Sequence, residues 1–166
     1  REWQESAEKA GNILFAIASG SGLADILFLQ GNLQEAKRSL EKTLLLAEQH
    51  EGARSVIANH YIGLAMIVHE LGNDETAKRY FDEGVKLAEQ STLVDTAYRI
   101  QIAQAQFMAF DRQFDNALDA LEEAKRVYIE SPIPKTQPVE ALIARIHLQQ
   151  GQLAKAQAWA KERNLS

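Results

Sequence analysis

Apolar residues recur with helical spacing through most of the chain. Two of the clearest series are Ala36, Leu40, Leu44 and Ala47, and Ala77, Phe81, Val85 and Ala88. Intervals of three and four residues place such side chains on one face of an α-helix. The sequence has no runs of β-branched residues bounded by turn residues, the pattern that indicates strands. The pattern therefore predicts an all-α protein.

The helical pattern occurs four times, with a period of about 40 residues. A turn position falls at Gly31, Gly72, Arg112 and Gly151, in steps of 41, 40 and 39 residues. In each repeat an alanine stands seven residues before the turn and another five residues after it: Ala24 and Ala36, Ala65 and Ala77, Ala105 and Ala117, Ala144 and Ala156. Glycine suits a left-handed helix C-cap, and alanine lets two helices cross closely. Each repeat is thus predicted to be a pair of antiparallel helices.

The predicted boundaries follow from these positions. The four units cover about 12–50, 53–90, 92–130 and 139–163, with helices at 12–30 and 32–50, 53–71 and 74–90, 92–111 and 114–130, and 139–150 and 152–163. Residues 92–95, Thr-Leu-Val-Asp, fit a capping box that opens the third pair. Small residues at Thr43, Gly84 and Ala124 are expected where the next unit's helix approaches. Residues 1–166 are expected to form a single repeat domain, cut from a longer chain.

These glycine-to-alanine turns resemble those of tetratricopeptide repeats, although the period is longer than the common 34 residues. The order and spacing of several segments make the chain similar to the tetratricopeptide-like region of the MalT-like family, the large ATP-dependent LuxR-type transcription activators. The similar segments are 10–12, 29–36, 44–47, 63–65, 70–77, 120–124, 144–153, 158–160 and 164–166. The resemblance implies a tetratricopeptide-like α-solenoid, a right-handed superhelix of about four helix-turn-helix units.

The resemblance also implies a function. Activators of this kind combine a nucleotide-binding switch module, a helical array and a C-terminal helix-turn-helix that binds DNA. The sequence here has neither a phosphate-binding Gly-x-x-x-x-Gly-Lys-Ser/Thr loop nor a basic reading helix. We therefore expect an effector-sensing, protein-interaction and oligomerisation module of a bacterial regulator, located in the cytoplasm. The alternative is a generic tetratricopeptide scaffold that grips a peptide and has no role in transcription.

The composition of the chain limits the kinds of binding and catalytic site that it can contain. The net charge of −5 disfavours binding of nucleic acid through this part of the protein. The absence of cysteine removes disulfides and thiolate sites, and no run of about 18 apolar residues predicts a membrane span. The four histidines lack the spacing of metal ligands, and the Gly20-Ser21-Gly22 segment lies inside a helical pattern rather than after a strand. We expect no enzyme active site, no metal and no cofactor.

A binding groove is the remaining candidate site. In a tetratricopeptide stack the first helix of each unit lines the concave side, where a small-molecule effector or a peptide would bind. Repeat register places these candidates there: Asp25, Phe28, Asn59, Met66, His69, Arg99, Gln106, Phe110 and Arg145. The other interpretation of these positions is an ordinary solvated surface.

Arg99 and Arg145 are the residues expected to grip a ligand. A guanidinium can hold a carboxylate or a hydroxyl-rich molecule through two parallel hydrogen bonds. The alternative is that these arginines pair with Asp25, Glu70 or Asp95 and tie neighbouring units together. Exposed pairs of that kind usually contribute less than about 1 kcal/mol.

Overall fold

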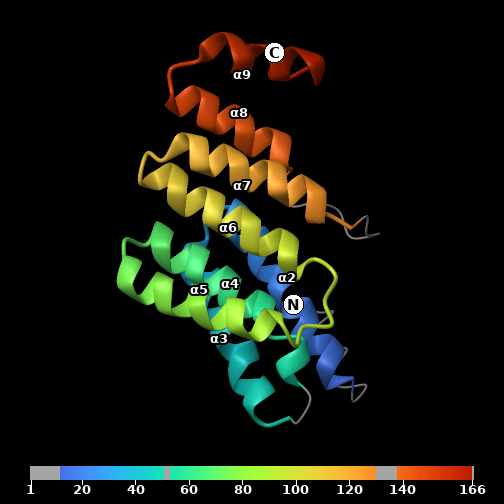
Figure 1. Cartoon of the computed structure of the whole chain (residues 1–166). Coiled ribbons are helices and arrows are strands. Elements are labelled where there is room, and N and C mark those ends of the chain that lie inside the picture. The colour runs from blue at the N-terminus through green and yellow to red at the C-terminus, as the bar shows by residue number, and fades with distance from the viewer. Residues whose placement is uncertain (1–11, 51–52, 130–137, 166) are drawn as a thin grey trace. The chain divides into compact units, whose positions relative to one another are not determined.

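The computed structural model describes residues 12–50, 53–129 and 138–165 (Figure 1). The described residues contain eight α-helices and one short 3₁₀ helix, and they contain no strand. The all-α prediction is confirmed. The chain divides into two compact units, Arg1–Ile100 and Gln101–Ser166, and the division falls inside helix α6. Each unit is described below by itself.

The first unit contains two helix pairs. Helices α2 and α3 pack together, α4 and α5 pack together, and α4 also contacts both helices of the preceding pair. The first residues of α6 complete this unit. The bounds are α2 Ile13–Leu29, α3 Leu33–Glu48, the 3₁₀ helix η1 Ala53–Ser55, α4 Ala58–Glu70, α5 Asp74–Ala88 and α6 Thr96–Phe110.

The second unit contains the remainder of α6 and three further helices. Helix α8 packs against both α7 and α9. The bounds are α7 Phe114–Val127, α8 Val139–Gln149 and α9 Leu153–Glu162.

The four predicted turns share one geometry. Gly31, Gly72 and Gly151 have φ angles of 76°, 80° and 75°, and Arg112 has a φ of 60°. In the first turn the Asn32 amide donates to the Leu27 carbonyl and the Gly31 amide donates to the Phe28 carbonyl, and the other three turns repeat both hydrogen bonds. This is the Schellman arrangement, in which a left-handed residue satisfies the last carbonyls of a helix. The turn register read from the sequence is confirmed.

The paired alanines lie in the buried core of the described helices. All eight are buried, with exposed fractions of 6% or less. Ala24 and Ala36 belong to one core cluster, together with Leu40, Leu64 and Ile67. Phe28 and Tyr80 pack against that cluster from its margin. Because these positions bury small side chains, the helix axes can approach closely, as the repeat predicted.

Two predicted helix starts were wrong. The segment at Ala53 is a single 3₁₀ turn, and α4 begins only at Ala58. The third pair begins at Thr96 rather than at Thr92. Thr92 caps no helix, because its amide and its hydroxyl both donate to the Ser55 carbonyl. The predicted capping box is therefore a loop that is tied to the end of η1.

The small residues of the second helices lie closest to their own partners. A Cβ atom on Gly84 would lie 2.6 Å from Cδ1 of Ile62, which belongs to α4 in the same pair. A Cβ atom on Gly20 of α2 would lie 2.7 Å from Oγ1 of Thr43 in α3, again in the same pair. At Gly84 and at Thr43 the closest crossing is therefore with the partner helix of the same pair rather than with the next unit. For Ala124 the approach of the next unit stays a prediction.

Candidate functional site

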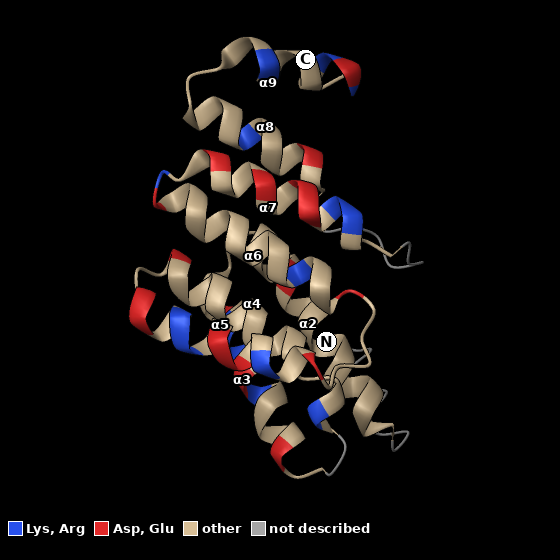
Figure 2. Ribbon diagram, viewed as in Figure 1, with Lys and Arg blue, Asp and Glu red and all other residues tan. Residues whose placement is uncertain are grey.

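Charge is distributed unevenly between the two helices of each of the first three pairs (Figure 2). Helices α3, α5 and α7 carry six, seven and six Asp, Glu, Lys or Arg residues. The first helices of these three pairs are almost uncharged: Asp25 is the only such residue of α2, Glu70 of α4 and Arg99 of α6. An ionised side chain on an apolar helix needs a partner if it is to be buried. Two of these three residues are partners of each other.

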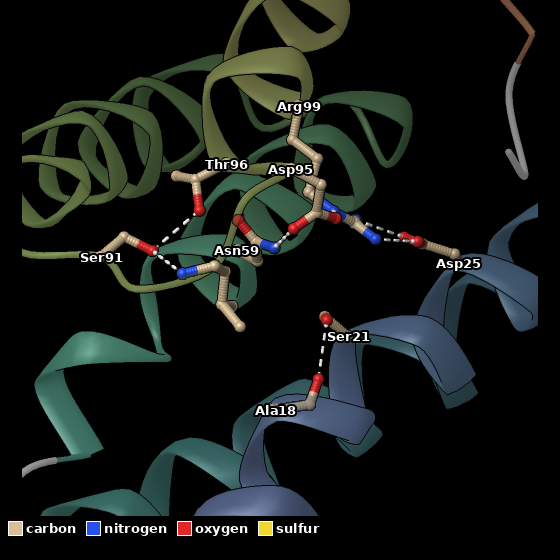
Figure 3. Close-up of polar contacts among 9 residues, drawn as sticks. Ala18, Ser21, Asp25, Asn59, Ser91, Asp95, Thr96 and Arg99 are labelled. Atoms are coloured by element: carbon tan, nitrogen blue, oxygen red, sulfur yellow. Dashed lines mark hydrogen bonds and ion pairs between the residues drawn. The ribbon is translucent and has the colours of Figure 1, made fainter. Parts of the chain in front are cut away.

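Arg99 and Asp25 form a bidentate ion pair across 74 residues of sequence (Figure 3). Arg99 Nη1 donates to Asp25 Oδ1 at 3.0 Å, and Nη2 donates to Asp25 Oδ2 at 2.5 Å. The side chains are 20% and 13% exposed, so the pair is largely removed from water. The planar guanidinium fork matches the two carboxylate oxygens, and this geometry makes such pairs strong.

Asp95 and Asn59 hold the other edge of the guanidinium. Arg99 Nε donates to Asp95 Oδ2 at 2.6 Å, one helical turn earlier. Asn59 Nδ2 of α4 donates to the other Asp95 oxygen at 2.8 Å. The Asn59 Oδ1 atom is buried and has no hydrogen-bond partner among the described residues. Four side chains from three successive helix pairs thus meet in one polar cluster, Asp25, Asn59, Asp95 and Arg99.

The electrostatics of the cluster favour a charged guanidinium. Burial alone would lower the pKa of Arg99, but the carboxylates of Asp25 and Asp95 outweigh it and raise that pKa above its usual range. With two carboxylates and one guanidinium, the cluster carries one negative charge in excess. Arg99 therefore stays protonated at any physiological pH.

The Arg99–Asp25 ion pair joins residues of repeats that are not adjacent in sequence. Asn59 and Arg99 occupy the same register, six residues before Ala65 and Ala105. Arg99 of the third pair nevertheless reaches Asp25 of the first pair, past the second. Repeat proteins usually contact only nearest neighbours. The cluster consequently links α2, α4 and the start of α6 directly within the first unit.

Comparison with known families places this geometry in context. The family model described as the MalT-like TPR region matches residues 1–166. The chain belongs to this family. Tetratricopeptide repeats are protein-interaction modules, in agreement with the helix pairs and turns described above. A search of curated proteins finds no match to the chain.

The other candidates of the first unit differ in their access to solvent. Met66 of this MalT-like TPR chain is 9% exposed and belongs to the core, and Asn59 is 1% exposed. Phe28 is half-buried at the edge of a core cluster. His69 Nδ1 lies 2.8 Å from Asp74 Oδ1, which ties the end of α4 to the start of α5. Among the candidates of this unit, the hydrogen-bonded cluster brings together only Asp25, Asn59 and Arg99.

The remaining candidates lie in the second unit. Phe110 is 64% exposed at the end of α6, and Gln106 is half-buried one turn earlier. Arg145 is exposed on α8. For Arg99, the structure shows the pairing alternative, with both Asp25 and Asp95. For Arg145, a ligand-gripping role stays a prediction.

Asp95 was expected as a possible pairing partner, and its i, i+4 spacing to Arg99 is the sequence signal for that pair. One feature of the first unit was not anticipated: His60 is fully buried. Burial lowers its pKa to about 4, and the charge of Arg99 adds to this, although the nearby backbone of Ile17 and Val56 opposes the shift. Neither of its ring nitrogens reaches hydrogen-bond geometry.

Among the described residues, no group of three His, Cys, Asp or Glu side chains is placed to hold a metal ion. None of the helices in that part of the chain combines the length and the apolar character that crossing a membrane requires.

Proposed function

We propose that this chain is the sensing and interaction module of a bacterial LuxR-type transcription regulator. The single observation that carries the proposal is the match of the MalT-like TPR region over residues 1–166. In such a regulator, nucleotide binding and DNA recognition would be supplied by other parts of the protein. The module would bind an effector and shift the balance between a self-inhibited and an assembled state.

The polar cluster supports this proposal. Asp25, Asn59, Asp95 and Arg99 come from three helix pairs, so a change at one of them alters contacts in the others. Coupling of this kind requires an element with two arrangements that a ligand can bias. The remaining candidates, among them Phe28, Gln106, Phe110 and Arg145, would extend the binding surface along the first helices.

The experiment is a ligand screen on the chain itself. Thermal shift against a library of bacterial metabolites should give stabilising compounds, and sedimentation velocity should then show a ligand-dependent change in self-association. A chain that binds no metabolite and shows no such change, yet binds peptides, would support the alternative of a generic interaction scaffold instead.

A further inference from the structure

One edge of the Arg99 guanidinium is hydrogen-bonded to Asp95, and its other edge binds the carboxylate of Asp25. Arg99 Nε donates to Asp95, which accepts from Asn59 in turn, so the guanidinium has a support that is separate from Asp25. The two terminal nitrogens of Arg99 point away from this support and take both oxygens of one carboxylate. An arginine fork that is oriented by its own helix and then filled by a carboxylate is the usual arrangement of a carboxylate-binding site.

The carboxylate that fills the fork comes from a different helix pair. Asp25 is the only charged residue among the 17 of α2, and no residue of α2 itself holds it there. Its side chain is 13% exposed, so it retains a path to water. The cluster already has one carboxylate more than its guanidinium can neutralise. Release of Asp25 into solvent in exchange for another carboxylate would leave the charge of the cluster unchanged.

We propose that the terminal nitrogens of Arg99 form a carboxylate-binding site and that Asp25 is its built-in occupant. A ligand carboxylate takes the place of Asp25 on Nη1 and Nη2, while Asp95 and Asn59 keep the guanidinium in position. Because the Arg99–Asp25 pair joins the start of α6 to α2, the exchange removes this contact between the two helices. This inference deepens the proposed function, since it names the chemistry of the effector and the contact that the effector changes.

Chemical rescue tests the site without knowledge of the natural ligand. Asp25→Ala removes the occupant and lowers the melting temperature. Sodium formate should then raise the melting temperature of this variant by about 2–4 °C once the site is well filled, relative to sodium chloride at the same ionic strength. The native chain should show no formate-specific change at these concentrations, because Asp25 fills the fork. Absence of a formate-specific rise in Asp25→Ala would overturn the proposal.

Two control variants locate the effect. Asp82→Ala removes an exposed carboxylate that pairs with Lys78 in the same unit, and formate should not rescue it. The double variant Asp25→Ala/Arg99→Met lacks the fork, so formate should leave its melting temperature unchanged. An equal formate response in the single and double variants would mean that formate acts elsewhere, and the proposal would fail.

A milder variant covers the case in which Asp25→Ala does not fold. Asp25→Asn keeps the shape of the side chain and one acceptor oxygen but removes the charge. The Arg99 Nε–H resonance of this variant should move on titration with formate, and the same resonance of the native chain should not. An unmoved resonance in Asp25→Asn would contradict the site even if every melting temperature were uninformative.

The same variant distinguishes the source of the natural carboxylate. Succinate represents a small acid, and an acidic tetrapeptide represents a protein partner. Tighter binding of succinate assigns the site to a metabolite, and tighter binding of the peptide assigns it to a protein segment. A failed metabolite screen combined with successful formate rescue would reject the proposed sensing of a small molecule but retain the carboxylate site.

Discussion

In the first three helix pairs, the first and second helices differ in the number of their charged residues and in the kind of ion pair that these form. The second helices are rich in exposed ion pairs one turn apart, such as Lys78 with Asp82 and Lys125 with Glu122. The first helices α2 and α6 contribute one charged residue each, and these two residues meet in a shielded bidentate pair. Exposed pairs on one helix gain little, because water screens them and the side chains lose freedom. Pairs shielded from water are weak evidence for net stability, but removal of one partner is costly. The two kinds of ion pair therefore differ most in what happens when they are broken.

Replacement of Arg99 should give the largest effect. Arg99→Ala leaves Asp25 and Asp95 close together and without a counter-charge, so we expect a loss of about 2–4 kcal/mol in the free energy of unfolding. Lys78→Ala, which breaks an exposed pair of α5, should cost less than about 0.5 kcal/mol. Urea denaturation of the two variants measures both quantities. Similar losses would abolish the distinction between the two kinds of helix.

Acid should destabilise the first unit through His60. Burial lowers the pKa of His60 from its ordinary 6.5 to about 4 in the folded chain. Between these values the unfolded chain binds the proton more readily. The stability is therefore full above about pH 6.5 and falls as the pH drops towards 4, by up to about 3 kcal/mol.

Substitution of His60 tests whether this residue causes the pH dependence, and substitution of His50 is the control. His60→Leu should flatten the loss of stability over this range, whereas His50→Leu should leave it in place. Melting temperatures recorded between pH 4 and pH 7.5 make the comparison. An unchanged profile in His60→Leu would show that other groups cause the acid sensitivity.

The close crossing of α4 and α5 should be sensitive to a single methyl group. Gly84→Ala places a Cβ atom 2.6 Å from Cδ1 and 3.2 Å from the backbone nitrogen of Ile62, so we expect a loss of about 1–2 kcal/mol. Gly22→Ala in α2 meets no atom within 4 Å and should stabilise the chain by about 0.5–1 kcal/mol, because alanine favours the helix. Thermal denaturation should give shifts of opposite sign.

The turn between α6 and α7 offers the smallest effect. Arg112 adopts the left-handed conformation that glycine adopts in the other three turns. Arg112→Gly removes the strain of the Cβ atom but makes the unfolded chain more flexible, so we expect a net gain of about 0.5–1 kcal/mol. Gly72→Ala should instead destabilise its turn. A loss of stability in Arg112→Gly would mean that the arginine side chain contributes contacts of its own.

Local pattern predicted the fold because its signals lie close together in sequence. The four turn positions and the eight paired alanines are set within 13-residue windows, and each behaves in the structure as its repeat requires. The two helix starts were wrong for the opposite reason. The loop before α6 is tied to Ser55, 37 residues away, and no local pattern reports that contact.

The candidate site shows the same limit. The sequence by itself determined that Asp25, Asn59 and Arg99 stand at repeat positions along the first helices. Only the tertiary structure decided that Arg99 forms its ion pair with Asp25 rather than with a residue of the second helix pair. That choice depends on how closely the start of α6 approaches α2, which is set by the packing of the helices within the first unit. The reach of one arginine across a repeat is thus a property of the fold, although each residue that permits it can be found in the sequence.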